Sequence, residues 1–201
     1  MTVQLVLATH NSHKVDELRR ILGDRLDGIE LIGYDGPEPV EDGDTFEANA
    51  LIKARAAAAH TGLAAIADDS GISATALGGA PGIHSARYAG TRDDRDNLEL
   101  LLTNLADASD RSAWFSCAAA LVVGDSERGD FEHVELGVWP GAVLTEAAGV
   151  GGFGYDPIFK PEGLEVSAAE LSADEKNAVS HRARAFEAIM PVVRARLLGE
   201  N

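Results

Sequence analysis

Residues 64–71 read Ala64-Ala65-Ile66-Ala67-Asp68-Asp69-Ser70-Gly71, a short apolar run that leads directly into two acids, a hydroxyl and a glycine. The small and branched apolar residues predict a buried strand. Ligands of α/β sheets collect just beyond the carboxyl ends of the strands. Because alternate residues of an extended chain point to opposite faces, Asp68 and Asp69 can face one ligand only if the backbone turns, which Gly71 would permit. The stretch therefore predicts a ligand site, and an ordinary turn after a strand is the alternative.

The segments around this stretch alternate between strand and helix patterns. Apolar side chains at Val15, Leu18, Ile21 and Leu22 recur at helical spacing, and an Asp-x-x-Glu capping box at 44–47 predicts a second helix start. The expected elements are a strand at 3–8, a helix at about 15–22, a strand at 30–34, a helix from 44 to about 60, a hairpin at 114–139 and a closing helix at about 186–197. A hairpin in a chain that begins β-α-β-α-β predicts an α/β fold with a mixed sheet, in one domain over residues 1–201.

Composition excludes several classes of function. The 201 residues include 17 basic and 33 acidic side chains, a net charge of −16, so the chain lacks the basic surface that nucleic-acid binding requires. No apolar run approaches the roughly 18 residues of a membrane span. The single cysteine, Cys117, lies in an apolar run and cannot form an intramolecular disulfide. We expect no signal peptide, no membrane partner and a cytoplasmic location.

Two further stretches carry polar chemistry. Thr9-His10-Asn11-Ser12-His13-Lys14 joins the first predicted strand to a helix, where free backbone N–H groups and the helix dipole favour a phosphate. An ordinary capped turn is the alternative. The run Gly151-Gly152-Phe153-Gly154-Tyr155-Asp156-Pro157 lets backbone approach a flat ligand on which an aromatic ring could stack. Lys176 with His181-Arg182 forms a cationic patch in a very acidic chain.

In this order, these motifs resemble the family of inosine triphosphate pyrophosphatases, also called XTP/dITP diphosphatases. The matching motifs are Ala8-Thr9-x-Asn11-x-x-Lys14, Glu41-x-Gly43-x-Thr45-Phe46-x-x-Asn49-Ala50-x-x-Lys53-Ala54, Ala67-Asp68-Asp69-Ser70-Gly71, Leu77-Gly78-Gly79-x-Pro81-Gly82, Ser85-Ala86-Arg87-Tyr88, Gly151-Gly152-Phe153-Gly154-Tyr155-Asp156-Pro157, Glu175-Lys176 and Ser180-His181-Arg182. Two positions depart from the family pattern. His10 stands where bacterial members often have glycine, and Ala48 stands where members often have an acid.

The resemblance implies a Mg²⁺-dependent hydrolase that converts nonstandard purine nucleoside triphosphates (ITP, dITP and XTP) to the monophosphate and pyrophosphate. It also implies an elongated mixed sheet flanked by helices, two lobes with the active site in the cleft between them, and a homodimer. The alternatives are a pyrophosphatase for other modified nucleotides on a related fold, and a nucleotide sensor without turnover.

By the same resemblance, Asp69 would accept the proton of the attacking water, and Glu41, Asp69 and Asp68 would bind the metal. The residues expected to bind the substrate are Thr9, His10, Asn11, Ser12, His13, Lys14, Lys53, Ser70, Phe153, Gly154, Tyr155, Asp156, Lys176, His181 and Arg182. Hypoxanthine presents an O6 acceptor and an N1–H donor, whereas adenine reverses both. An acceptor at Asp156 paired with a donor at Arg182 would therefore select ITP over ATP, with Phe153 stacked on the purine.

Overall fold

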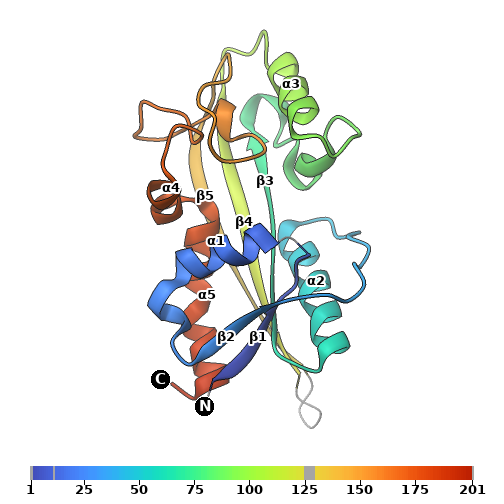
Figure 1. The fold of residues 1–201 in the computed structure, drawn as a ribbon. Coiled ribbons are helices and arrows are strands. Elements are labelled where there is room, and N and C mark those ends of the chain that lie inside the picture. Colours follow the sequence, from blue (N-terminus) through green and yellow to red (C-terminus); the bar gives the residue numbers. More distant parts are fainter. Residues whose placement is uncertain (1, 11, 125–129, 201) are drawn as a thin grey trace. The chain divides into compact units, whose positions relative to one another are not determined.

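The computed structural model describes residues 2–10, 12–124 and 130–200, without the side chains of residues 12 and 13. In these ranges six strands form one mixed sheet in the order β2-β1-β3-β4-β5-β6 (Figure 1). The strands are β1 Val3–Leu7, β2 Ile29–Gly33, β3 Ala65–Ala74, β4 Ser112–Val123, β5 Phe131–Val143 and β6 Phe159–Pro161, and the helices are α1 Ser12–Leu22, α2 Phe46–Thr61, α3 Asp94–Asn104, α4 Ala173–Val179 and α5 His181–Leu198. The predicted α/β class with a mixed sheet is confirmed.

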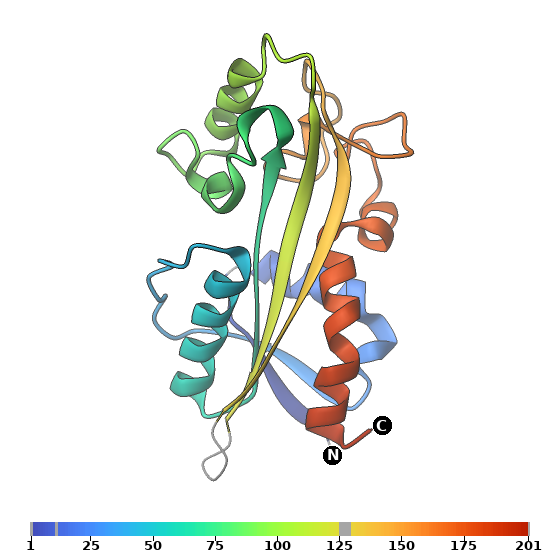
Figure 2. The ribbon, with the colours of Figure 1, turned by 180° about the vertical axis from the view of Figure 1, so that it is seen from behind.

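The chain forms two compact units. The first comprises Met1–Asp69, Cys117–Gly137 and Arg182–Asn201. Here β1 pairs in parallel with both β2 and β3. Helices α1 and α5 share one hydrophobic cluster with the sheet, whereas α2 packs in a second cluster. Figure 2 shows α2 and α5 on opposite sides of the strands.

Local sequence patterns explain the helices of this unit. Val15, Leu18, Ile21 and Leu22 are all buried, as their spacing predicted for α1. Helix α2 instead buries alanines, which let it lie close to the sheet. Its N-cap is Thr45, whose hydroxyl accepts a hydrogen bond from the Ala48 N–H at 3.1 Å. The predicted capping box with Asp44 is therefore wrong by one residue.

The second unit comprises Ser70–Ser116 and Val138–His181. Its core contains Phe115, Trp139 and Phe159, and the Phe159 ring contacts Phe115 edge to face and Trp139 at a tilt. Strand β6 pairs with β5 in antiparallel register, with Ala142 opposite Lys160. Whether the two units behave as a single domain stays a prediction. No helix in the described ranges is long and apolar enough to cross a bilayer.

The course of strand β3 differs from the turn that its sequence suggested at the two acids and Gly71. It runs without a turn from Ala65 to Ala74, through both acids and Gly71. A Cβ atom at Gly71 would lie 2.4 Å from the Gly82 carbonyl oxygen and 2.5 Å from Ser85 Oγ. Gly71 is therefore needed for close packing and not for a turn. Because the strand stays extended, Asp68 and Asp69 point to opposite faces.

Candidate active site

A pocket of about 390 Å³ lies in the first unit, where β1 ends and the loop before α1 begins. This is the edge of the sheet at which α/β proteins bind ligands. Its wall combines cations and acids in a chain of large negative charge. The lining residues are Ala8, Thr9, His10, Lys14, Tyr34, Glu38, Pro39, Glu41, Lys53 and Asp68.

Lys53 lies between two carboxylates on the α2 side of the sheet. Its Nζ atom is 3.1 Å from Glu41 Oε2 and 2.9 Å from Asp69 Oδ1. Burial would lower the pKa of Lys53, but the charges of Asp69, Asp68 and Glu41 outweigh burial and raise it. Burial raises the pKa of Asp69 despite the opposing effect of Lys53. Lys53 thus stays charged, while Asp69 is a stronger base than an exposed carboxylate.

Asp68 lies on the other face of β3 and has a different set of partners. Its Oδ2 atom accepts hydrogen bonds from Arg182 Nη2 at 3.1 Å and Nε at 3.3 Å, and its Oδ1 atom is 3.5 Å from Lys14 Nζ. Arg182 also donates to Glu17 Oε2 at 3.2 Å. Burial would raise the pKa of Asp68, but Lys14, Arg182 and Lys53 hold it well below its usual range. Asp68 is therefore ionised at neutral pH and joins α1, β3 and α5.

The positions of Glu41, Asp68 and Asp69 can be compared with the prediction that all three bind a metal. Among the described residues, no group of three or more His, Cys, Asp or Glu side chains is arranged to hold a metal ion. Asp68 points away from the face that carries Asp69, which accounts for this. Glu41 and Asp69 do converge on one cation, the Lys53 ammonium. Mg²⁺ commonly takes one or two protein carboxylates and completes its shell with water and phosphate oxygens, so this pair fits Mg²⁺.

The predicted phosphate loop is only partly described. Thr9 and His10 line the pocket, and Lys14 reaches it from the first turn of α1. Asn11 lies outside the described residues, as do the side chains of Ser12 and His13. The pocket therefore brings Thr9, His10, Lys14 and Lys53 together, and their part in substrate binding stays a prediction.

A second set of predicted residues gathers in the second unit. The phenyl ring of Phe153 is half exposed, and Lys176 Nζ lies 4.7 Å from its centre. The Lys176 ammonium also contacts the buried Asp156 Oδ2, which accepts a hydrogen bond from the Phe153 N–H at 2.9 Å. Gly152 has φ +70°, and a Cβ there would lie 2.1 Å from Asp156 Oδ2. The glycine-rich run thus presents an aromatic ring beside a buried ion pair.

Other predicted residues in this unit have structural partners. Tyr155 is 5% exposed and its hydroxyl donates to the Ser85 carbonyl at 2.8 Å, while burial raises its pKa. The His181 ring stacks on Phe115 at 4.6 Å. Ser70 is half-buried on β3. Tyr155 and His181 thus belong to the core, and the substrate roles of Ser70, Tyr155 and His181 stay predictions.

The expected partnership between Asp156 and Arg182 can be compared with their actual partners. Asp156 binds Lys176 and the Phe153 backbone, whereas Arg182 binds Asp68 and Glu17. Arg182 is 4% exposed, and three of its N–H groups point at carboxylates. The geometry gives Arg182 a structural role, and its role at the purine edge stays a prediction.

Sequence reasoning did not assign roles to three residues that hold the site. Asn49 donates to Asp69 Oδ2 at 3.3 Å and accepts the Gly43 N–H at 2.9 Å. Glu17 binds Arg182, and Asp94 accepts the Gly154 N–H at 2.8 Å. Glu17 follows Lys14 at helical spacing, which was a usable signal. Asp94 gave none, because it was one acid among several at a helix start.

An α/β sheet with buried acids, balancing cations and a polar loop at a strand end is typical of proteins that bind phosphate-bearing ligands. Comparison with known proteins agrees with this class. Residues 5–192 match the Ham1 family, and the chain belongs to that family.

Individual relatives match along nearly their whole length. A protein of Leifsonia xyli subsp. xyli called dITP/XTP pyrophosphatase is 59% identical over 196 residues, which is 96% of each chain. The solved structure of a HAM1 protein from Coxiella burnetii is 43% identical, with a TM-score of 0.86 over 96% of this chain and 98% of that one. A nucleoside-triphosphatase / dITP/XTP pyrophosphatase from Mycobacterium abscessus is 45% identical, with a TM-score of 0.75 over 94% of this chain and 100% of that one.

Proposed function

We propose that this chain hydrolyses dITP, XTP and ITP to the nucleoside monophosphate and pyrophosphate, removing nonstandard purines from the nucleotide pool. Relatives that match over nearly the whole chain carry the name dITP/XTP pyrophosphatase. The observation that carries the proposal is the Lys53 ammonium held between Glu41 and Asp69, beside a pocket that also contains Lys14.

Asp69 is the proposed proton acceptor. The oxygen of a water molecule forms a bond to the α-phosphorus, the bond from that phosphorus to the bridging oxygen breaks, and pyrophosphate leaves with the bond's electrons. The water proton passes to Asp69, whose raised pKa makes it a better base. Asn49 holds Asp69 Oδ2, so that Oδ1 keeps one orientation.

Lys53 and Lys14 would bind phosphate oxygens. A nucleoside triphosphate carries up to four negative charges, so a chain of net charge −16 needs cations gathered at the site. Glu41 and Asp69 would hold Mg²⁺, which when bound neutralises phosphate charge and polarises the phosphorus–oxygen bonds. These cations stabilise the charge that develops on the leaving pyrophosphate.

The second set of residues, in the second unit, would bind a purine. Phe153 offers an exposed ring for stacking, and Lys176, whose Nζ atom lies over that ring, offers N–H donors. A donor there suits the O6 acceptor of hypoxanthine and xanthine and opposes the amino group of adenine. Asp156 fixes both residues, which makes the selection rigid.

We further propose a homodimer in the cytoplasm. The resemblance to inosine triphosphate pyrophosphatases supports the dimer, and light scattering after size-exclusion chromatography tests it. The single cysteine, Cys117, is free and fully buried, so the chain has no intramolecular disulfide that would require an oxidising compartment. Fractionation of the source cells tests the location.

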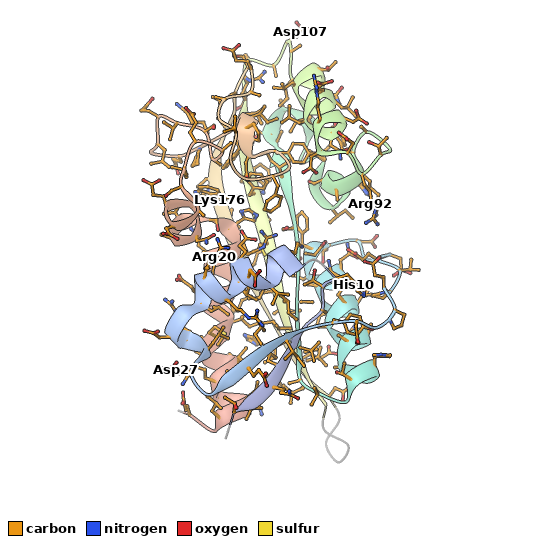
Figure 3. All side chains as sticks on the ribbon, in the orientation of Figure 1. His10, Arg20, Asp27, Arg92, Asp107 and Lys176 are labelled. Carbon is orange, nitrogen blue, oxygen red and sulfur yellow. The ribbon has the colours of Figure 1, made fainter. Side chains whose placement is uncertain are left out.

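Release of pyrophosphate and of phosphate from dITP, XTP, ITP, dATP and GTP, with Mg²⁺ and with EDTA, tests the function. We expect metal-dependent pyrophosphate from the first three substrates and about 10²-fold less or none from Asp69→Asn. Asp107→Asn is the matched control, because Asp107 is exposed in a turn of the second unit and does not line the pocket that contains Lys53 (Figure 3). The panel also includes modified pyrimidine and methylated nucleotides, and turnover of these alone would favour the related pyrophosphatases. Tight nucleotide binding without turnover would favour a sensor.

A further inference from the structure

His10, one of the two residues that depart from the family pattern, contacts a neighbouring loop through both ring nitrogens. Its Nε2 atom lies 2.7 Å from the Gly36 carbonyl oxygen, and its Nδ1 atom lies 3.1 Å from Glu38 Oε1. A carbonyl oxygen can only accept, so Nε2 donates to Gly36. The ring also lies 5.5 Å from the ring of Tyr34, whose hydroxyl donates to the Pro37 carbonyl at 3.0 Å. Figure 3 shows His10 beside the loop that precedes α2.

This loop is the irregular segment 34–45 between β2 and α2. It carries Glu41, one of the two carboxylates that converge on Lys53. Its far end is fixed by Asn49, which binds the Gly43 N–H, and by the Thr45 cap. A loop of this length keeps a defined conformation only where side chains bind its backbone, because conformational entropy opposes its order.

The packing around Gly36 indicates that the contact is specific. A Cβ atom at Gly36 would lie 2.4 Å from the Tyr34 hydroxyl oxygen and 2.6 Å from a ring carbon of His60. Gly36 is therefore enclosed by Tyr34 and His60, with its carbonyl directed at His10. Glu38 is 70% exposed in its side chain and adds a second contact to the ring at the rim. The Gly36 bond is the inner and shorter of the two.

We propose that His10 is a positioning residue that fixes the first half of the 34–45 loop and thereby holds Glu41 at the pocket. A glycine at position 10 would leave Gly36 and Glu38 without this anchor. His10 then acts on Mg²⁺ binding through Glu41, and not as a direct phosphate ligand. The inference rests on the proposed function for its catalytic consequence, but the anchor itself is a property of the loop.

Three variants test whether His10 anchors the 34–45 loop or binds phosphate directly. His10→Gly removes both contacts, and His10→Gln keeps an amide donor for the Gly36 carbonyl. His133→Gly is the matched control, because His133 forms a similar His–Glu pair, 2.8 Å from Glu135, with a side chain 33% exposed, compared with 38% for His10. His133 lies on β5 and does not line the pocket that contains Lys53.

The first measurement is amide hydrogen exchange of a peptide spanning residues 36–43, on the folded protein without substrate or metal. We expect exchange in His10→Gly to be about tenfold faster, as for the loss of one ordinary hydrogen bond. His10→Gln should recover most of the protection, and His133→Gly should match the unmodified chain. Unchanged exchange in His10→Gly would overturn the anchor, and this result does not depend on which substrate the protein hydrolyses.

The second measurement is the Mg²⁺ concentration that gives half-maximal pyrophosphate release from dITP, together with Mg²⁺ binding followed by calorimetry. In His10→Gly the half-maximal Mg²⁺ concentration and the Mg²⁺ dissociation constant should both rise about tenfold. KM for dITP at saturating Mg²⁺ should change less than threefold. A large rise in KM with unaltered Mg²⁺ constants would identify His10 as a phosphate ligand and refute the proposal. Absence of turnover with every nucleotide would instead refute the proposed function, and the exchange result would stand.

Discussion

Replacing Arg182 with methionine removes the guanidinium that binds Asp68 and keeps a long side chain in its place. The side chains of Arg182 and Asp68 are each 5% exposed, and two hydrogen bonds of 3.1 and 3.3 Å join them. Removal of one partner from a buried pair typically destabilises a protein by about 3–5 kcal/mol. Lys14 remains 3.5 Å from Asp68, so we expect a loss of about 3 kcal/mol in the free energy of unfolding.

The loss should depend on pH in a defined direction. In the unmodified chain the pKa of Asp68 is held well below its usual range, so its ion pairs contribute stability above the unfolded pKa of about 3.9. That contribution disappears as the pH falls through the folded pKa. In Arg182→Met the pKa of Asp68 rises, because burial is then opposed by fewer cations. The difference between the two proteins should be complete above about pH 5 and should shrink below about pH 4.

Urea unfolding followed by far-ultraviolet circular dichroism at several pH values measures these differences. A double-mutant cycle with Asp68→Asn is the control, because the Arg182 substitution should cost only about 1 kcal/mol once the buried anion is gone. A penalty below about 1 kcal/mol at neutral pH, or one that stays constant from pH 3.5 to 7, would refute the role assigned to this pair.

Two other substitutions have defined outcomes. Gly152→Ala should lower the free energy of unfolding by more than the roughly 1–2 kcal/mol of left-handed strain, because its Cβ would also clash with Asp156 Oδ2. Gly163→Ala is the control, because Gly163 has φ +80° and open space around it, so that this substitution should show the strain alone. Thermal unfolding compares the two variants. Lys53→Met should raise the pKa of Asp69 further, since burial then acts without its nearest cation. The acidic limb of kcat/KM for dITP should therefore move to higher pH, and an unmoved limb would exclude Asp69 as the base.

The sequence predicted those parts of the fold that local patterns determine. The spacing of Val15, Leu18, Ile21 and Leu22 was sufficient for α1, and alternation of strands and helices was sufficient for the mixed sheet. Strand β3 was misread because two acids, a serine and a glycine are typical of a turn. A buried strand tolerates them here only because cations from other elements balance the acids.

The pairing of side chains within the site was harder to predict, because the partners come from distant parts of the chain. Asp68 and Arg182 are 114 residues apart, and no local pattern joins them. The motifs placed both residues near a ligand, but they could not show that Arg182 binds Asp68. Asp156 and Lys176 are 20 residues apart and were likewise expected to act separately. Donor and acceptor counts limit which pairs can form, whereas only the folded chain determines which pairs do form.

Because β3 stays extended through both acids, the site depends on the register of this strand. Asp68 serves one face of the strand and Asp69 the other, so an inserted or deleted residue before them would move each acid to the opposite face. An insertion would place Asp68 in the position that faces Lys53, whereas a deletion would place Asp69, the proposed proton acceptor, in the position that faces Arg182. Libraries built on this fold should therefore vary side chains along β3 and leave its length unchanged.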